Sequence, residues 1–328
     1  MTKDVKKIVV YANFPITPTP GYISFFNEIF LNNQYVCVDV NNPKTAEFAI
    51  SLNHTESNLK KIIDSNIPKS KRVLIMFECK QILPDMHKPE VLSQYGFIFS
   101  PSPYWAKGFN PVMFHYPLHL EKPMSVSTLS TRKYQFGIIQ RNHLSCIKGE
   151  LYSLRRQLIR IFEGDMQVRG EGWNKSKLLQ IYNYYKLVRY YLRNLKLNEV
   201  NLVPRHLIKD SSFLPVVDKQ EFLESVKVAI IIENGSGYVS EKLFDCFRAG
   251  TVPIYVGPSL SLFGVPEECV IRSDPKVENL IEVMNSIYKH NLEAIRASGF
   301  KFLNGEGQAW SDDIAMCDLA KKIVNAIN

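Results

Sequence analysis

The stretch 228–257, VAIIIENGSGYVSEKLFDCFRAGTVPIYVG, constrains the fold of this chain more than any other part of the sequence. It opens with the continuous apolar run 228–232, which is typical of a strand buried on both faces of a sheet. The glycine-containing segment 233–237 indicates a turn, and apolar residues then recur at helical spacing as far as Gly250. A second apolar run covers 252–256. The stretch therefore predicts strand, loop, helix and strand, which is one βαβ unit.

The junction between the loop and the helix carries residue types that suit a phosphate. A helix that begins after an N-cap at Ser240 presents unpaired backbone N–H groups and the positive end of its dipole. Lys242 falls in the first turn, where a cation opposes the dipole, and a bound anion would explain its position. Glu241 suits ribose hydroxyls, and Tyr238 suits stacking on a nucleotide. An ordinary βαβ turn with a solvated Glu–Lys pair accounts for the same residues, and local physics leaves both interpretations open.

The longer string ENGSGYVSEKLFDCFRAGTVPIYVGP resembles the C-terminal signature of the α-1,3/α-1,4-fucosyltransferase family. That signature places an Asn after an acidic residue, then an aromatic–hydrophobic–Ser/Thr–Glu–Lys run, then a strand with Val and Pro near its start. The gap between Asn234 and Tyr238 is shorter here than in the family, which leaves the position of the loop on base or sugar open. The matching residues are Glu233, Asn234, Tyr238, Val239, Ser240, Glu241, Lys242, Gly250, Thr251, Val252 and Pro253.

The resemblance implies an α/β fold of the GT-B type, in which two Rossmann-like domains face each other across a cleft. It implies an inverting transfer of fucose from GDP-fucose to a hydroxyl of a glycan acceptor. The N-terminal domain would present the acceptor, and the C-terminal domain would hold the nucleotide sugar. Five signature residues would bind the donor, namely Glu233, Asn234, Tyr238, Glu241 and Lys242.

Length and patterning fit this organisation. The 328 residues suffice for two domains, and strand-like and helical segments alternate along the chain, as in a doubly wound parallel sheet. The polar segment 121–132 reads as a linker. We therefore predict an N-terminal domain over 1–130 and a C-terminal domain over 131–328, with the last helix crossing back to the first domain as two-domain sugar transferases often do.

An amphipathic helix is predicted over 150–162, with leucines inward and arginines on its flanks. In the family, a helix at this place carries an Arg that reaches the donor diphosphate. The spacing of the family pattern matches Arg155, with Arg156 as the neighbouring candidate. A guanidinium fork suits phosphate oxygens. A solvated basic helix face is the alternative for either residue.

The sequence has no P-loop, no GxGxxG fingerprint and no Asp-x-Asp pair of the kind that holds a divalent ion in many glycosyltransferases. We therefore predict that Lys242, an Arg of the 150–162 helix and a helix N-terminus neutralise the diphosphate without a metal. No cofactor is expected to be required, and a divalent metal is expected at most to stimulate. His115 and His119 flank Pro117, so they do not share a helix face, and no metal site is assigned.

The acceptor hydroxyl needs a general base, and Glu78 is the candidate. It follows the apolar run 72–77, which is predicted to be a strand, and the segment LIMFECKQILP resembles a family segment in which a Glu follows a strand. The alternative is a strand-end Glu in a surface ion pair. Glu233 is a second candidate, more suited to contacting the sugar or ordering the donor loop.

The segment 175–197, KSKLLQIYNYYKLVRYYLRNLKL, is basic, aromatic and free of acidic residues. One interpretation is a helix that packs its apolar stripe into the protein and keeps its lysines in water, and this is the one we favour. The other is a helix that meets an acidic glycan or lies peripherally on an anionic membrane. The stripe predicted to face inward consists of Leu178, Tyr182, Tyr185, Val188 and Leu192.

Net charge, cysteine content and the length of apolar runs indicate which ligands and which cellular compartment to expect. The net charge of +8 fits an anionic ligand or surface, and the six cysteines are scattered, which favours buried free thiols over disulfides. No apolar run is long enough for a membrane span or a signal peptide, so a cytoplasmic protein is expected, with attachment to the inner face of a membrane left open. The partners expected are a nucleotide sugar and a glycan acceptor, not nucleic acid.

Two alternatives to fucosyl transfer stay open at this point. The first is a related glycosyltransferase that uses another nucleotide sugar, because the Asn234–Tyr238 loop is altered. The second is a non-catalytic protein on the same scaffold that binds glycan or nucleic acid through the basic helix. The second predicts binding that survives the loss of Lys242 and weakens strongly with salt.

Overall fold

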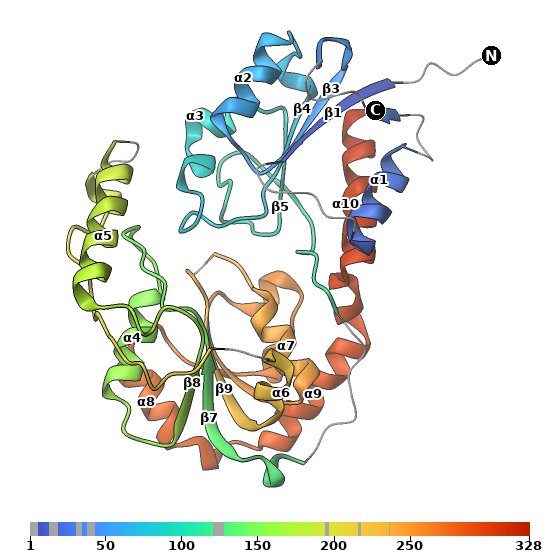
Figure 1. Cartoon of the computed structure of the whole chain (residues 1–328). Helices are drawn as coiled ribbons and strands as arrows, with labels where there is room; N and C mark the ends of the chain where they lie inside the picture. The colour runs from blue at the N-terminus through green and yellow to red at the C-terminus, as the bar shows by residue number, and fades with distance from the viewer. Residues whose placement is uncertain are drawn as a thin grey trace. The chain divides into compact units, whose positions relative to one another are not determined.

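The computed structural model describes residues 6–12, 19–30, 35–37, 43–120, 128–193, 197–215, 218–235 and 237–328. The chain divides into two compact units, 1–120 together with 308–328, and 121–307. Each unit has its own parallel sheet and its own core (Figure 1).

The described part of the first unit contains a six-stranded sheet in the order β2-β1-β3-β4-β5-β6, and every pair is parallel. A parallel sheet needs cover on both faces, and its inner strands are correspondingly apolar. The strands are β1 (Lys6–Ala12), β2 (Tyr35–Cys37), β3 (Phe48–Leu52), β4 (Arg72–Ile75), β5 (Phe97–Ser100) and β6 (Val112–Met113). The helices are α1 (Pro20–Phe30), α2 (Glu56–Asp64), α3 (Pro89–Leu92) and α10 (Asp312–Ile327).

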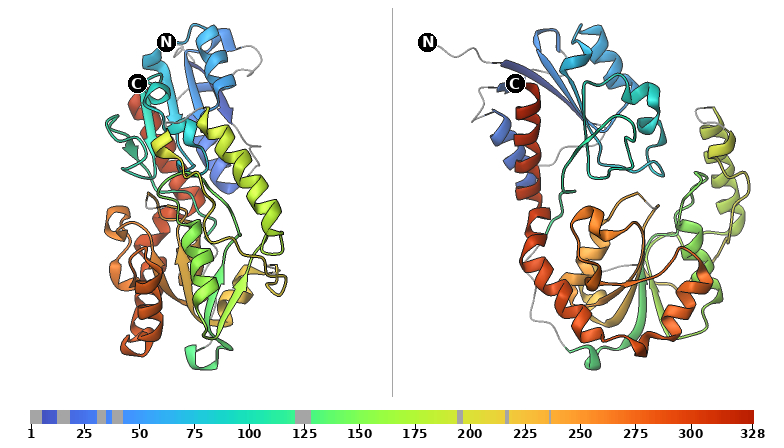
Figure 2. Two further views of the ribbon diagram at one scale, coloured as in Figure 1. Left: turned by 90° about the vertical axis from the view of Figure 1, so that its left-hand side faces the viewer. Right: turned by 180° about the vertical axis from the view of Figure 1, so that it is seen from behind.

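Helices α1 and α10 lie side by side on one face of this sheet (Figures 1 and 2). Phe25 and Ile29 of α1 share one buried cluster with Leu319 and Ile323 of α10 and with the strands. The C-terminal helix is therefore part of the core of the first unit.

The described part of the second unit contains a five-stranded sheet in the order β11-β10-β9-β7-β8, again parallel throughout. The strands are β7 (Tyr134–Ile139), β8 (Met166–Arg169), β9 (Val226–Ile232), β10 (Val252–Val256) and β11 (Ile271–Arg272). The helices are α4 (Tyr152–Ile161), α5 (Lys177–Leu192), α6 (Lys219–Glu224), α7 (Glu241–Ala249), α8 (Val277–Asn285) and α9 (Leu292–Asn304).

The βαβ unit predicted for 228–257 is confirmed as β9, α7 and β10. Leu243, Cys246 and Phe247 are buried on the inner face of α7, as their spacing predicts. Gly250 ends the helix in the left-handed region with φ 60°, where glycine carries no Cβ penalty. The α/β fold is confirmed, whereas the strand predicted over 72–77 ends earlier, at Ile75.

The order of the second sheet contains a topological switch point. Strands β7 and β9 are neighbours, but β8 lies on the far side of β7 and β10 on the far side of β9. Connections from the carboxyl ends of β7 and β9 therefore lead to opposite sides of the sheet. In open α/β sheets, ligands bind outside the carboxyl ends of the strands at such a switch point.

Candidate functional site

The loop after β9 and the segment before α4 are joined at the carboxyl edge of β7 and β9. Gln140, which follows β7, donates from Nε2 to the carbonyl oxygen of Ile232 at 3.0 Å. The backbone N–H of Leu151, at the start of α4, donates to the carbonyl oxygen of Asn234 at 3.1 Å. These bonds place the N-terminus of α4 and the signature loop at the switch point.

Arg155 donates hydrogen bonds to the end of β9 and to the loop that follows it. Its Nε donates to the carbonyl oxygen of Ile232 at 3.1 Å, and its Nη2 donates to the same oxygen and, at 2.9 Å, to Oδ1 of Asn234. Asn234 in turn donates from Nδ2 to the hydroxyl of Tyr238 at 3.0 Å. The guanidinium lies 4.7 Å from the centre of the Tyr152 ring, within cation–π range. Arg155 therefore holds the side chains of Asn234 and Tyr238 in register, and its burial lowers its pKa.

Arg156 points elsewhere. Its Nη1 donates to the carbonyl oxygen of His143 at 2.6 Å, and its Nε donates to that of Arg205 at 3.1 Å. Both arginines are buried, so the solvated basic face considered for this helix is wrong at these two positions. Their acceptors include carbonyl oxygens of Ile232, 77 positions from Arg155, and of Arg205, 49 positions from Arg156, which the local pattern does not reveal.

Glu233 follows β9 directly and has no exposed surface. Its Oε1 accepts from the backbone N–H of Ser240 at 2.9 Å and from the hydroxyl of Tyr255 at 3.3 Å. Its Oε2 is buried with no hydrogen-bond partner among the described residues. Burial raises the pKa of this carboxyl, and the charge of Lys242 opposes that shift. A Cβ at Gly257 would lie 2.9 Å from Cγ of Glu233, so the glycine gives this carboxylate its room.

Lys242 lies in the first turn of α7, and its side chain is only 17% exposed. Its Nζ donates to Oγ of Ser240 at 3.2 Å and lies 3.5 Å from Oε1 of Glu241. Ser240 occupies the N-cap position but makes no side-chain cap bond to the helix. The interpretation as a solvated Glu–Lys pair is therefore wrong for Lys242, because most of its side chain is covered. The pKa of the Glu241 carboxyl is raised by desolvation but lowered on balance by Lys242 and Lys219.

Glu78 belongs to the first unit, in the loop after β4, and is half-buried. His87 holds the backbone there, with Nε2 3.0 Å from the carbonyl oxygen of Glu78 and Nδ1 3.2 Å from that of Trp105. Burial lowers the pKa of His87 to about 4. The role of Glu78 as general base stays a prediction.

The structure brings together the five predicted residues of the signature and Arg155. Sequence reasoning missed Gln140 and Tyr255, which buttress the same loop. Their positions in the sequence could have indicated them, because Gln140 directly follows an apolar strand and Tyr255 lies inside the signature itself. That these residues bind a nucleotide stays a prediction.

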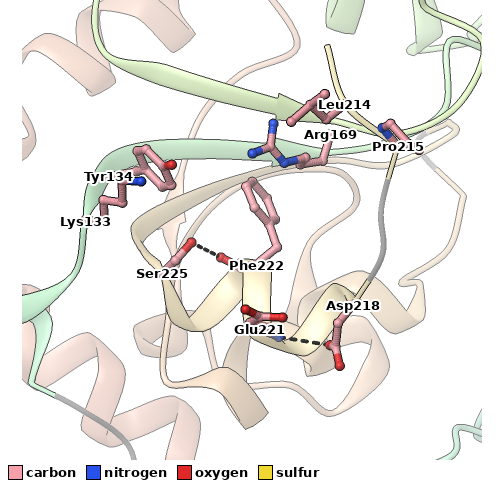
Figure 3. Close-up of a pocket in the computed structure, with 9 residues that line it drawn as sticks. All are labelled: Lys133, Tyr134, Arg169, Leu214, Pro215, Asp218, Glu221, Phe222 and Ser225. Carbon is pink, nitrogen blue, oxygen red and sulfur yellow. Dashed lines mark hydrogen bonds between the residues drawn. The ribbon is translucent and has the colours of Figure 1, made fainter.

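A separate cavity of about 480 Å³ lies beside α6 and the start of β7 (Figure 3). None of its lining residues belongs to the predicted site, and its charges are of both signs. Asp218 is engaged in capping α6, because its Oδ1 accepts from the backbone N–H of Glu221 at 3.0 Å. We assign this cavity no ligand. The lining residues are Lys133, Tyr134, Arg169, Leu214, Pro215, Asp218, Glu221, Phe222 and Ser225.

Within the part of the chain that the structure describes, no three or more His, Cys, Asp or Glu side chains gather in a way that could hold a metal ion. Independence from metal stays a prediction. No helix in the described ranges combines the length and the apolar character that a bilayer span requires.

Solved structures resemble this chain over its whole length. HepE of Anabaena in complex with UDP matches 98% of this chain and 100% of its own, with a TM-score of 0.59 and 10% identity. An α1,3-fucosyltransferase with GDP matches 100% of this chain and 92% of its own, with a TM-score of 0.52 and 13% identity. A glycosyltransferase from Rickettsia africae matches 98% of each chain, with a TM-score of 0.50 and 12% identity.

The fold is GT-B. At these identities the likeness extends to the fold and not to the activity. No protein-family model matches the chain, and no curated protein matches it in sequence.

Proposed function

We propose that this protein is a glycosyltransferase that moves a sugar from a nucleotide sugar to a hydroxyl of a glycan acceptor. The observation that carries the proposal is the position of Lys242. This lysine lies in the first turn of a helix at the switch point of a parallel sheet, beside a loop that Arg155 and Glu233 hold in place. A helix N-terminus and a fixed cation together form a site for a phosphate.

Fucose from GDP-fucose is the donor we propose first. The signature from Glu233 to Pro253 supports this choice, as does the likeness in fold to an α1,3-fucosyltransferase solved with GDP. A UDP-sugar donor is the second candidate. It is favoured by the altered loop between Asn234 and Tyr238 and by the likeness in fold to HepE, which was solved with UDP-glucose.

In the proposed reaction, negative charge develops on the diphosphate as the bond to the sugar breaks. Lys242 and the N–H groups that begin α7 would stabilise that charge, and a preorganised cation costs no rearrangement at the transition state. Glu78 would accept the proton of the acceptor hydroxyl. Arg155, whose described bonds go to protein acceptors, would act by positioning Asn234 and Tyr238. We propose no cofactor, and a divalent metal that at most stimulates.

A thermal-shift panel of GDP, GDP-fucose, GDP-mannose, UDP and CMP, first with chelator and then with manganese, tests the donor site. A ligand at about 100 times its Kd adds roughly 2.7 kcal/mol, which corresponds to a shift of about 5–10 °C. We expect guanine nucleotides to shift the protein without metal. If UDP gives the larger shift, a UDP-sugar becomes the proposed donor. If no nucleotide gives a shift, both donor proposals are contradicted.

The panel is repeated with Lys242→Ala and with a matched control, Lys276→Ala. Lys276 is exposed and sits at the N-cap of α8, so it is also a lysine beside a helix N-terminus in the same unit. We expect the shift to be lost in the first variant and kept in the second. Equal shifts in both would mean that the nucleotide binds elsewhere.

A further inference from the structure

Helix α5 carries a second surface that the proposed donor site does not use. The helix has 16 residues and begins after Ser176, whose side chain accepts from the backbone N–H of Leu179 at 3.2 Å. Its inner face packs on the cluster of Leu144, Cys146, Ile147 and Val200. Figures 1 and 2 show α5 beyond the β8 side of the sheet. The buried residues of the helix are Gln180, Tyr184, Val188 and Tyr191.

The stripe predicted to face inward points outward instead. Of its five residues only Val188 is buried, whereas Leu178 is 79% exposed and Tyr182 57%. The reason is that two apolar stripes wind round this helix at the same spacing, and the Tyr184–Tyr191 stripe packs inward. Single exposed apolar residues are ordinary, but a cluster of them on one helix face is not. The exposed apolar residues of α5 are Leu178, Leu179, Tyr182, Tyr185, Tyr190 and Leu192.

Lysines and arginines of the same helix accompany this apolar stripe. Lys186 lies on the same face as Tyr182, with its Nζ 4.3 Å from the centre of that ring. The segment 172–198 contains no Asp or Glu, so the i, i+4 ion pairs of an ordinary solvated helix are absent from its sequence. Residues 194–196 of the predicted helical segment lie outside the described residues. The exposed cations are Lys175, Lys177, Lys186, Arg189 and Arg193.

We propose that the outward face of α5 docks on an anionic lipid bilayer, with the helix parallel to the surface. Leucine and tyrosine side chains would enter the boundary between headgroups and acyl chains, where tyrosine is enriched in membrane proteins. The lysine and arginine stems would lie along that boundary while their charges meet lipid phosphates. An acidic glycan would use the cations and tyrosines but would leave Leu178 and Leu179 in water. The leucines therefore favour lipid.

The test is co-sedimentation of the full chain with vesicles of phosphatidylcholine alone and of phosphatidylcholine with phosphatidylglycerol. We expect binding to the anionic vesicles that weakens as salt is raised, because exposed charges are screened. Binding of equal strength to neutral vesicles, or to neither kind, would overturn the proposal. Binding to a soluble anionic polysaccharide but not to vesicles would assign the face to a glycan and would also overturn it.

Two double variants separate the apolar and the charged parts of the face. Lys186→Gln with Arg189→Gln should weaken partitioning by at least about tenfold, since each cation near an anionic surface contributes about 1 kcal/mol. Leu178→Gln with Tyr182→Gln should weaken it to a similar extent, because burial of apolar surface is lost. Glutamine keeps helix propensity in both, and circular dichroism checks that the fold is intact.

The matched control is Tyr288→Gln with Lys289→Gln, which removes another exposed tyrosine and lysine from the same unit. We expect this variant to bind vesicles as the unaltered chain does. If it loses binding as the α5 variants do, the interaction is general charge attraction and the proposal fails. Because nucleotide shifts should be unchanged in all three variants, this result is independent of the proposed function.

Discussion

Two glutamates in this chain follow buried parallel strands, yet their surroundings differ. Glu233 comes directly after β9, is fully buried, and holds the backbone of Ser240 and the hydroxyl of Tyr255 through one oxygen. Glu78 comes after β4, is half-buried, and has its backbone held by His87. The comparison shows that the end of a strand fixes where a carboxylate lies. The groups around the carboxylate then decide whether its role is structural or chemical. Glu233 belongs to the framework, whereas proton transfer by Glu78 stays a proposal.

The sharpest test of this division is Glu78→Gln. We expect the rate of sugar transfer to fall by about 100- to 10,000-fold, because general base catalysis contributes on that scale. The melting temperature and the nucleotide-induced shift should stay as they are, since the amide keeps the size of the side chain. Steady-state kinetics and thermal shift measure both. Near-normal turnover would remove Glu78 from the role and bring Glu233 forward.

The variant Lys242→Ala tests whether the helix start next to the loop that Glu233 holds in place also stabilises the negative charge that develops in the reaction. We expect transfer to fall by about 100- to 1000-fold, the scale on which loss of a preorganised group at a developing charge is felt. Far-ultraviolet circular dichroism should be unchanged. Retention of activity in this variant, at the level of the matched control Lys276→Ala, would mean that Lys242 does not stabilise the charge that develops in the reaction.

The framework itself is tested by comparing Arg155→Met with Arg156→Met. Both side chains are buried and hydrogen-bonded, so each loss should lower the free energy of unfolding by about 1–3 kcal/mol in urea titrations. Only Arg155 contacts Asn234, so only its replacement should also weaken the nucleotide-induced shift. Equal loss of the shift in both variants would mean that Arg155 has no special position at the site.

The smallest effect concerns Glu233→Gln and pH. Because the pKa of Glu233 is raised in the folded protein, its charged form costs the fold stability at pH values above the unfolded pKa. As the pH falls through the folded pKa towards the unfolded pKa, protonation of the native carboxyl relieves that cost, with a slope of at most about 1.4 kcal/mol per pH unit. Urea titrations should therefore show that the free energy of unfolding of the unaltered chain rises relative to that of the glutamine variant as the pH falls. A gain for the variant instead would contradict the direction of the shift.

The parts of the fold that could be predicted are those encoded locally. The runs that become β9, α7 and β10 are continuous and end at Gly250, so their order follows from sequence. The burial of Arg155 could not be predicted, because its acceptors at Ile232 and Asn234 lie 77 and 79 positions away. The inner face of α5 was mispredicted because tyrosine suits both a core and a surface. The donor sugar stays a proposal, since it depends on the loop that contains Ser236, which lies outside the described residues.

The position of α10 has a consequence for synthesis of the chain on the ribosome. Leu319 and Ile323 belong to the same core as β1 and α1, which are translated before them. The first unit therefore lacks part of its core until the final helix has emerged, whereas all residues of the second unit are available earlier. Since domains generally fold as units, the second unit can fold during translation, and the first to be translated is the last to be completed.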